Sequence, residues 1–429
     1  MFTSHKIAAG ENPAFARARP EWPPVVVAGA FQTAVVLMRN LVRRGLTACC
    51  IDWLPTQPGF RTVYGKAYLC PHPQENPAAW ERFMAELAGR FPCKPVLICS
   101  SDQFVTAVSA HAERLKDLFV FCQAPATQAL LATKERQYDI AGTHGLPVPL
   151  TQNVHTAEEL MAFAAGIRFP CLLKPNHCTD WERVPSSHPL YGRKVVIVPS
   201  HADLAVAYRL AAEASPDVVV QEIIEGPDTA KLVYLSCYDR HSRRIGSCML
   251  REVRTHPIHF GSASVVEPVS DPEADRLCDG FLQSIGYQGI CEIELKRDTR
   301  DGCVKMIEAN PRYSVTADAG PYAGVDIGWL HYLDLIGQPV AETNPSPQDF
   351  RHIVLLRDVP TIRSYRRQKL LTWRELIRSY RRPVYFFDFD WRDWRVSAST
   401  VLSLARFAVG RLLRRLHLKR ESTSEVMAL

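Results

Sequence analysis

The sequence predicts an α/β domain followed by an α+β region, and three observations support this prediction. Short apolar runs alternate with helical patterns over about residues 22–125, which is typical of a doubly wound parallel sheet. Farther along, apolar runs follow one another with fewer helices between them, which indicates an antiparallel sheet with helices on one face. The length of 429 residues allows two or three domains that pack together.

Four strands and three helices are predicted in the first domain. The strands correspond to PVVVAGAF, TACCIDWLP, KAYLC and PVLICSSDQ, and the helices to QTAVVLMRNLVRRG, AAWERFMAELAGRF and FVTAVSAHAERL. The strands are rich in β-branched residues, whereas the helical segments repeat apolar residues at helical spacing. The loop GAFQTA after the first strand lacks the later glycines of a dinucleotide-binding fingerprint, so NAD binding is not expected.

The second region contains two helical segments around a proline-containing turn and then a series of strands. The helices lie within QALLATKERQYDIAGTHGLPVPLT and TAEELMAFAAGI, and a later one is EADRLCDGFLQSIG. The strands correspond to CLLKP, KVVIVP, VVVQEII, KLVYLSCYD, GSCMLREVR, GICEIELKRD and CVKMIEANP. Residues 340–400 are less regular, and a basic amphipathic helix follows at 401–420.

The composition is that of a globular protein without a membrane span. Hydrophobic residues make up 47% of the chain, and no uncharged apolar run is long enough to cross a bilayer. The first twenty residues lack the apolar core of a secretory signal. The 13 cysteines are scattered without a CxxC pair, so we expect buried, reduced thiols and a cytoplasmic location.

Positive charge is concentrated near the C-terminus. Residues 351–420 hold 18 Lys or Arg against 5 Asp or Glu, whereas the whole chain carries only +6. Residues 1–350 are therefore net acidic. Because a nucleic-acid enzyme is more often basic around its core, nucleic acid is not an expected partner.

Two neighbouring strands carry acidic and amide side chains. Alternation places Glu292 and Glu294 on one face of their strand, and Glu308 and Asn310 on one face of the next. Side chains on paired strands lie about 5 Å apart, so these oxygens can converge as ligands for Mg²⁺. Arg312 follows two residues later and can bind an anion. A solvated acidic face of a hairpin explains these residues equally well.

Two lysines favour the metal and phosphate interpretation. Lys174 ends the apolar run CLLKP, and Lys134 opens a helix in ATKERQYDIA. A single lysine at a strand end is usually solvated. Together with the acidic hairpin, however, two lysines indicate a nucleoside triphosphate, whose oxygens require several cations around them.

The chain resembles ATP-grasp enzymes over roughly residues 22–335. The resemblance lies in KERQYDIAGTHGLPVP, FPCLLKP, VVVQEIIEGPD, REVRTHPIHFG, GYQGICEIELKRD and MIEANPR, which occur in the family's order and spacing. Among subgroups, the chain is most similar to carboxylate–amine ligases related to D-aspartate ligase and to carbamoyl-phosphate-synthase-like proteins. The fold implied is an ATP-grasp fold behind an N-terminal pre-ATP-grasp α/β domain.

The resemblance also implies domain boundaries. The flexible N-terminus would cover 1–21, the pre-ATP-grasp domain 22–126 and the ATP-grasp region 127–340. Within that region, a lid part is expected at about 165–225 and a catalytic α+β part at about 226–340. A C-terminal extension would cover 341–400, and the basic helix and tail 401–429.

Roles for individual residues follow from the same resemblance. It implies that Lys134 and Lys174 contact the α- and β-phosphates, and that Asp228 bonds the ribose hydroxyls. The adenine would meet Gln221 and the backbone at Glu222 and Ile224. Two Mg²⁺ (or Mn²⁺) ions would be held by Glu294, Glu308 and Asn310. The expected catalytic residues are Arg312, which would stabilise the transferring phosphoryl group, and Arg254, with Arg251 as a weaker candidate.

The implied reaction is an ADP-forming ligation. ATP converts a small-molecule carboxylate into an acyl phosphate, an amine then attacks, and ADP and phosphate are released. Two alternatives remain open, namely activation of bicarbonate as in carbamoyl-phosphate chemistry and an ATP-binding regulatory protein without turnover. A homodimer is a possible assembly.

The lid segment departs from the family pattern. Many relatives carry a glycine-rich lid, whereas NHCTDWERVPSSHPLYGRK contains only Gly192. Arg193 or Lys194 could replace part of its phosphate contacts. Gln221, where many relatives carry Glu, is a milder departure because its amide oxygen also accepts hydrogen bonds. The residues His177, Cys178 and His188 do not have the spacing of a zinc site.

The C-terminal segments allow more than one interpretation. VYFFDFDWRDWR, residues 384–395, is expected to pack on the core. The helix 401–420 alternates apolar residues with arginines, so it could lie on anionic lipid at the inner face of a membrane or bind a partner. Docking on its own domain is equally consistent with this pattern.

Overall fold

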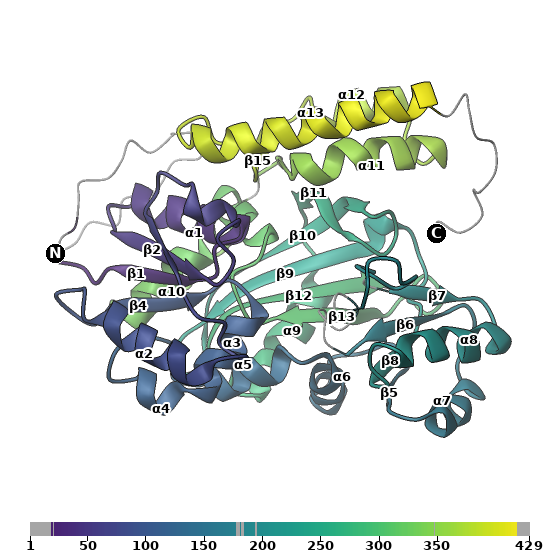
Figure 1. The fold of residues 1–429 in the computed structure, drawn as a ribbon, viewed down its shortest axis with the longest axis horizontal. Helices are drawn as coiled ribbons and strands as arrows, with labels where there is room; N and C mark the ends of the chain where they lie inside the picture. Colours follow the sequence, from purple (N-terminus) through teal and green to yellow (C-terminus); the bar gives the residue numbers. More distant parts are fainter. Residues whose placement is uncertain are drawn as a thin grey trace.

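The computed structural model describes residues 19, 21–176, 181, 184–193, 195–346 and 348–417. Within these ranges, the side chains of 134, 135, 407, 408 and 410–417 are not described. The described residues form three sheets, and a layer of C-terminal helices lies along one side of the molecule (Figure 1).

The N-terminal domain is the parallel α/β unit that the sequence predicts. Its strands run in the order β3-β2-β1-β4 and are all parallel. They span Lys66–Leu69, Ala48–Asp52, Val25–Ala28 and Val96–Cys99, with helices α1 (Gln32–Arg43), α2 (Pro77–Ala88), α3 (Asp102–Ala110) and α4 (Ala112–Leu115). The central strand β1 is buried along its whole length, as expected for a strand with helices on both faces of its sheet.

A small antiparallel sheet follows two connecting helices, α5 (Pro125–Leu131) and α6 (Lys134–Thr143). Its strands run in the order β5-β8-β6-β7 and span Thr151–Val154, Val218–Glu222, Cys171–Pro175 and Val196–Val198. Helices α7 (Ala157–Ala164) and α8 (His201–Ala212) pack on it through a shared apolar cluster. This unit begins at β5, earlier than the boundary of about 165 expected for the lid part.

The largest sheet has seven strands in the order β13-β12-β9-β10-β11-β14-β15. These strands span Val304–Asn310, Gly289–Arg297, Lys231–Tyr238, Arg244–His256, Ser262–Pro268, Arg351–Ile353 and Val384–Phe386. The strands expected in one antiparallel sheet are therefore divided between two sheets. The last two strands come from the C-terminal extension, so this segment completes the central sheet rather than following it.

The seven-stranded sheet has an apolar cluster on each face. On one face, Tyr234, Ile293 and Leu295 pack with α9 (Pro272–Ser284). On the other face, Val233 and Leu235 belong to a cluster that includes the N-terminal domain, the 3-10 segment η4 (Thr316–Ala323) and α10 (Ile327–Leu335). The second cluster joins the domains, and the candidate site lies on this same face because Val233 and Leu235 pair with Glu294 and Glu292.

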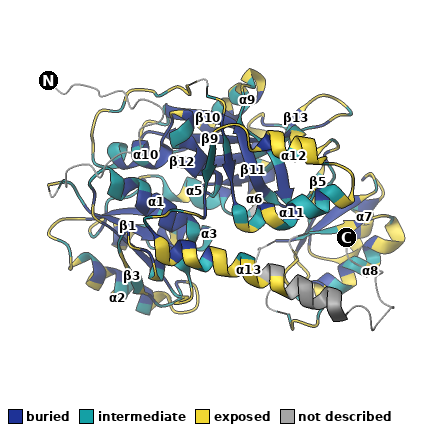
Figure 2. Cartoon of the chain, turned by 90° about the horizontal axis from the view of Figure 1, so that it is seen from above, coloured by how far each residue is buried: buried dark blue, intermediate teal, exposed yellow. Residues whose placement is uncertain are grey.

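Three helices form an outer layer over the edge of this sheet (Figures 1 and 2). They are α11 (Leu355–Arg367), α12 (Trp373–Ser379) and α13 (Trp394–His417). The carboxylate of Asp388 caps the start of α11 by accepting hydrogen bonds from the amides of Leu355 and Leu356. Asp390 pairs with Arg43 of α1 at 2.8 Å, which ties the layer to the N-terminal domain as well.

Candidate functional site

The acidic hairpin is built by β12 and β13, which pair in antiparallel register. Glu294 lies opposite Glu308, and Glu292 lies opposite Asn310. Alternation along each strand puts all four side chains on the same face of the sheet, and opposite residues have β-carbons about 5 Å apart. The convergence expected of Glu294, Glu308 and Asn310 is therefore present in the register.

A continuous set of hydrogen bonds runs from this hairpin to the N-terminal domain. Asn310 Nδ2 donates to Glu292 Oε1 at 3.0 Å, and Arg312 Nη2 donates to Asn310 Oδ1 at 2.8 Å. Arg312 also forms a bidentate ion pair with Asp102 at the start of α3, at 2.6 and 3.1 Å. Asn310 thus has a fixed orientation, and the guanidinium expected to clamp a phosphoryl group is held by a carboxylate.

Two fully buried carboxyl groups lie beside the metal-ligand candidates. Burial, reinforced by the Glu294 carboxylate, raises the pKa of Glu292 to about 8. Burial likewise raises the pKa of Glu252 on β10 to about 8, against the opposing effect of Lys231 and with contributions from Glu294 and Glu292. Negative charge is therefore crowded at this point of the sheet, and a bound cation would relieve it.

Lys174 and Gln221 meet on the small sheet, where β6 pairs with β8. Lys174 Nζ donates to Gln221 Oε1 at 2.6 Å, and Gln221 Nε2 donates to Thr151 Oγ1 at 2.9 Å. The amide oxygen expected to face an adenine amino group is therefore occupied by Lys174 in this structure.

Tyr138 of α6 connects Lys174 to the acidic hairpin. Its hydroxyl donates to the carbonyl oxygen of Ile307, the residue before Glu308, at 2.7 Å. Lys174 Nζ lies 6.0 Å from the centre of the Tyr138 ring. Tyr138 thus links Lys174 of the small sheet to the backbone of β13 next to Glu308.

The segment after β8, which was expected to line the adenine pocket, is held by the β12–β13 hairpin. Lys296 Nζ donates to the carbonyl oxygen of Ile224 at 2.8 Å. Arg300, in the hairpin turn, pairs with Glu222 at 2.7 Å and donates to the carbonyl oxygen of Ile223 at 3.2 Å. The segment after β8 includes Gly226, whose φ of 124° is a conformation that favours glycine.

Asp228 begins the 3-10 segment η3 (Asp228–Ala230) directly before β9. Its carboxylate accepts hydrogen bonds from the Tyr365 hydroxyl and from the backbone amide of His259, the latter at 3.3 Å. Although burial opposes the effect, the Tyr365 hydrogen bond and Lys231 hold the pKa of Asp228 below its ordinary value. The group is an ionised hydrogen-bond acceptor, as a ribose-binding carboxylate must be.

Arg254 occupies a different environment from the one expected for a catalytic arginine. It is 2% exposed and forms a bidentate ion pair with Asp358 of α11, at 2.7 and 2.9 Å. It also donates to Ser379 at 3.1 Å. Its guanidinium therefore fastens the outer helices to β10, and the geometry does not favour contact with phosphate. Arg251 pairs with Glu267 on the neighbouring strand β11.

Several expected residues cannot be placed. The side chain of Lys134 lies outside the described residues, although its backbone begins α6. His177, Cys178 and Lys194 also lie outside the described part of the chain. Arg193 is exposed, and His188 contacts Glu213 at 3.2 Å.

Sequence reasoning missed Glu252, Lys231 and Arg357. Lys231 Nζ lies 3.6 Å from Glu252 Oε2, and that oxygen accepts no hydrogen bond among the described residues. Arg357 on α11 donates from Nη1 to the carbonyl oxygen of Ala263 at 3.1 Å. Burial lowers its pKa, whereas the Glu294 carboxylate raises it, so the two groups interact electrostatically. Alternation along LREVR could have indicated Glu252, but nothing local in the sequence indicates that α11 lies over the site.

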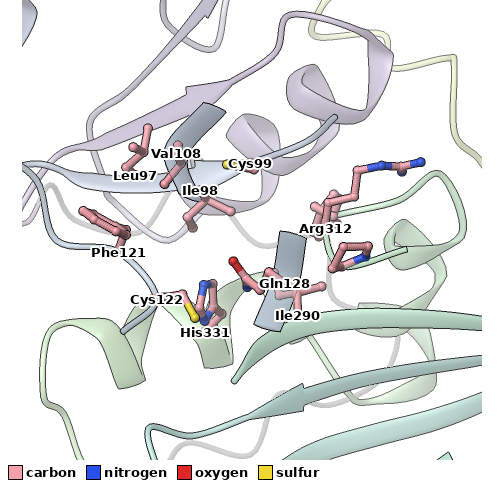
Figure 3. Close-up of a pocket in the computed structure, with 12 residues that line it drawn as sticks. Leu97, Ile98, Cys99, Val108, Phe121, Cys122, Gln128, Ile290, Arg312 and His331 are labelled. Carbon is pink, nitrogen blue, oxygen red and sulfur yellow. The ribbon is translucent and has the colours of Figure 1, made fainter. Parts of the chain in front are cut away.

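A small cavity lies behind Arg312 at the junction of the N-terminal domain and the large sheet (Figure 3). Its lining includes Cys99, Gln128, Ile290 and His331, whereas the Arg312 side chain extends away from the other side chains. The volume of about 20 Å³ has room for about one water molecule. This cavity is therefore too small to be a substrate pocket.

The donor set fits a magnesium ion that is completed by a nucleotide. Among the described residues, no three His, Cys, Asp or Glu side chains form a group that could bind a metal unaided. Mg²⁺ is normally held by one or two carboxylates, with phosphate oxygens and waters as the other ligands. Glu294, Glu308 and Asn310 match that pattern, and the buried Oε2 of Glu252 beside them accepts no hydrogen bond among the described residues.

The arrangement of the sheets defines the class of the protein. A small antiparallel sheet carries Lys174 and Gln221, and a larger sheet carries the acidic hairpin behind an N-terminal parallel domain. This is the ATP-grasp fold. The structural comparisons below confirm it, as the motifs predicted.

Curated relatives confirm the resemblance to ATP-grasp carboxylate–amine ligases. The chain is 26% identical over 235 residues to a D-aspartate ligase from Enterococcus faecium, which covers 51% of this chain and 53% of that protein. It is 24% identical over 211 residues to the C-terminal section of a carbamoyl phosphate synthase large chain from Methanopyrus kandleri, covering 46% and 36%. The chain spans about half or less of these relatives, and no family model matches it.

Solved structures share the fold at low identity. An N5-carboxyaminoimidazole synthetase from Staphylococcus aureus complexed with ADP has a TM-score of 0.62 at 13% identity, covering 84% of this chain and 89% of that one. An L-amino acid ligase from Bacillus licheniformis has a TM-score of 0.54 at 15% identity, covering 73% and 74%. The third is the biotin carboxylase domain of a Hydrogenobacter thermophilus 2-oxoglutarate carboxylase, a dimer in complex with MgADP, ADP and bicarbonate. It has a TM-score of 0.59 at 17% identity, and the match covers 74% of this chain and 70% of that one.

Proposed function

We propose that the chain is an ATP-dependent carboxylate–amine ligase that forms ADP and phosphate. The observation that carries this proposal is the pairing of Glu294 with Glu308 on neighbouring strands. Lys174 supports it, because its Nζ lies 6.0 Å from the ring of Tyr138, whose hydroxyl donates to the backbone of the residue before Glu308. A bound triphosphate needs both cationic side chains and metal ligands along its phosphates. Lys174 would supply the first, and the acids of β12 and β13 would supply the second. The similarity to D-aspartate ligase and to an L-amino acid ligase fold supports an amino-acid-like substrate.

The nucleotide is proposed to lie between the small sheet and the large sheet. Adenine would contact Gln221 and the backbone at Glu222 and Ile224, and Asp228 would accept from the ribose hydroxyls. Lys174 and Lys134 would contact the phosphates. The short contact between Lys174 and Gln221 would open when phosphate oxygens compete for the ammonium group.

Two Mg²⁺ ions are proposed at the hairpin, held by Glu294, Glu308 and Asn310. When bound, they would neutralise charge on the phosphates during transfer. The hydrogen bonds that fix Asn310 between Glu292 and Arg312 would keep its oxygen directed for this task. Because only two carboxylates would be shared by two ions, phosphate oxygens and waters would supply the remaining ligands.

The proposed reaction has two steps, and neither needs a nucleophile from the protein. An oxygen of the carboxylate attacks the terminal phosphorus, the bond to ADP breaks, and an acyl phosphate forms. The amine nitrogen then attacks the carbonyl carbon, phosphate leaves, and the amine loses a proton. Arg312 would stabilise the transferring group, and Arg357 would offset negative charge above the acids. Exclusion of water from the site would protect the acyl phosphate from hydrolysis.

Bicarbonate activation is a second candidate for the same site. Similarity to a carbamoyl phosphate synthase section favours it, because a bicarbonate oxygen can accept the phosphoryl group of ATP as a carboxylate oxygen does. A homodimer is proposed on the analogy of the biotin carboxylase domain dimer, and light scattering after gel filtration would test it.

Purified protein with Mg-ATP tests the proposal through ADP release. Panels of amino acids and amines should yield ADP only with one matching pair, and bicarbonate with ammonia forms a separate arm. A pair that yields equimolar ADP, phosphate and a condensation product supports the ligase. Tight ATP binding without ADP release in every arm would instead indicate a regulatory ATP-binding protein.

A further inference from the structure

The outer layer carries large apolar side chains that face solvent. Trp391 is 68% exposed, Trp394 is 63% exposed and Trp373 is 60% exposed, and Ile377, Val401 and Leu402 are also more than half exposed. In the view from above, α12 and much of α13 are exposed on the side of the molecule that the outer helices cover (Figure 2). We call these six side chains, with the exposed arginines between them, the outer face.

One face of helix α13 packs against the rest of the protein, and another face is exposed. Val396, Ser397 and Thr400 are buried against the layer beneath. A second stripe is exposed and consists of Trp394, Ala398, Val401, Leu402, Ala405 and Val409. These positions follow helical spacing and fall within about 100° of arc. Docking on its own domain therefore explains only the first face of this helix.

In the segment 351–420, most acidic side chains are turned toward the protein, whereas many basic side chains are exposed. Four of its five acids point inward: Asp358 pairs with Arg254, Asp388 caps α11, Asp390 pairs with Arg43, and Asp393 accepts from Thr62. Glu375 is the single exposed acid among the side chains described between 351 and 409.

The exposed bases of the same segment number eight, six of them between Arg367 and Arg382, followed by Arg395 and Arg406. The exposed charged side chains described in this segment are therefore eight bases against one acid.

Arginine and tryptophan lie together at three places on this face. Arg366 lies 3.9 Å from the ring centre of Trp373, Arg392 lies 5.1 Å from that of Trp391, and Arg395 lies 5.5 Å from that of Trp394. Tryptophan is enriched where a bilayer meets water, and arginine is attracted to anionic headgroups. Each pair offers both properties at the same depth.

We propose that the outer face docks on a membrane surface that contains anionic lipids. Helix α13 would lie in the plane of the interface with its exposed stripe in the headgroup region and its arginines beside the phosphates. Insertion across the bilayer is not involved, because among the described helices none combines the length and apolarity that crossing requires. The proposal does not depend on the ligase activity.

Other occupants fit this face less well. A two-fold dimer would bring each arginine-rich patch against a copy of itself, and like charges would face each other across the contact. Nucleic acid would match the charge but would leave the apolar stripe of α13 in water. An anionic membrane satisfies both the charge and the apolar stripe.

Flotation of the full chain with vesicles tests the proposal. Vesicles of phosphatidylcholine with phosphatidylglycerol should carry the protein upward, whereas phosphatidylcholine alone should carry little. Trp394→Ser combined with Leu402→Ser should weaken binding roughly tenfold or more, because apolar area is lost from the interface. Leu69→Ser is the matched control, since Leu69 is 56% exposed on β3 of the N-terminal domain.

Charge is tested separately with Arg395→Glu and Arg406→Glu. This pair should remove the preference for phosphatidylglycerol, and added salt should do the same. All the substituted side chains are exposed, so an unchanged melting temperature verifies that the variants fold.

Three results would overturn the proposal. They are failure to float with anionic vesicles, binding that the Trp394 and Leu402 substitutions leave unchanged, and a dimer or a nucleic-acid complex that those substitutions disrupt in place of vesicle binding. ADP release measured on the same samples keeps this result separate from the ligase proposal.

Discussion

Glu294 and Glu308 lie directly opposite each other on β12 and β13, with the buried carboxyl groups of Glu252 and Glu292 beside them. Such crowding of acids destabilises a folded protein unless protons or cations neutralise it. The raised pKa values of Glu252 and Glu292 indicate that protons do so in the free chain. Single substitutions can test the metal site proposed at this point.

Glu308→Gln should abolish turnover while the chain remains folded. The amide keeps the size of the side chain but removes a charged ligand, so kcat should fall roughly 100-fold or more. ADP release under saturating Mg-ATP measures the effect. Glu113→Gln is the control, because Glu113 is exposed on α4 of the N-terminal domain. Full activity in the Glu308 variant would rule out the metal assignment.

Stability in the absence of metal should depend on pH through Glu252. Unfolded, this carboxyl loses its proton near 4.5, whereas in the fold burial raises the pKa to about 8. The folded chain binds more protons between these values, so the free energy of unfolding should fall as pH rises through that window. Below the lower value the contribution is fully present.

Chemical denaturation across the same pH window, in the presence of a chelator, measures this slope. Glu252→Gln cannot titrate and should flatten the slope in part, leaving the share that Glu292 contributes. Glu113→Gln should leave the slope as in the parent chain. Identical slopes for the parent and the Glu252 variant would show that this carboxyl is ionised in the fold.

The residue-level prediction from sequence was strongest where side chains share a strand face. Alternation and strand pairing suffice to bring Glu294, Glu308 and Asn310 together, because both are local properties. The partners of the arginines were not predictable in this way. Arg254 meets Asp358, 104 positions away, and Arg312 meets Asp102, 210 positions away, so only the folded arrangement reveals that each guanidinium is already paired.

At the level of elements, the outer helices depend on a buried ion pair. Arg254 on β10 and Asp358 on α11 are both buried, and Ser379 and Tyr380 at the end of α12 complete the hydrogen bonds. Breaking a buried pair from one side leaves an uncompensated charge. This pair therefore contributes to holding α11 on the sheet.

Arg254→Met should destabilise the chain by about 3–5 kcal/mol, because Asp358 would remain buried without its partner. Combining it with Asp358→Leu should recover much of that loss, since no charge is then left inside. Urea denaturation of the two single variants and the double variant measures the coupling. Purely additive losses would show that the pair does not act as a unit.

Element types in the N-terminal domain were predictable because each strand is a short, continuous apolar run. The hydrophobic pattern alone did not divide the later strands into two sheets, whereas the family resemblance had separated a lid part from a catalytic part. Short strands such as β14 and β15 have three residues each. They are too short to show alternation, and they exist because the edge of the large sheet offers backbone partners.

For the whole molecule, the N-terminal domain and the large sheet are joined by a buried charged network. Arg39 of α1 forms a bidentate contact with Asp318 of η4, at 2.9 and 2.8 Å, and His352 of β14 lies 3.0 Å from the same carboxylate. Although burial opposes the effect, Arg39 and His352 hold the pKa of Asp318 well below its ordinary value. The domains therefore meet through a contact that requires an ionised Asp318.

Asp318→Asn should lower the free energy of unfolding by about 3 kcal/mol or more, because Arg39 would be left buried without a carboxylate. In the parent chain this contribution is present above the ordinary Asp pKa of 3.8 and is lost as acid protonates the group. Thermal unfolding near neutral pH measures the loss. Asp203→Asn, at an exposed position of α8, is the control, and equal melting temperatures for both variants would contradict the account.

The central claim is that this chain uses ATP to phosphorylate a carboxylate, and isotope transfer tests it most directly. The carboxylate identified by the ADP-release panel is prepared with heavy oxygen in both positions and incubated with Mg-ATP and the amine. Mass analysis of the released phosphate should find one heavy oxygen per molecule, in equal amount to ADP, because an acyl phosphate leaves with an oxygen of the acid. Phosphate without label, released alongside ADP, would show that the carboxylate is never phosphorylated.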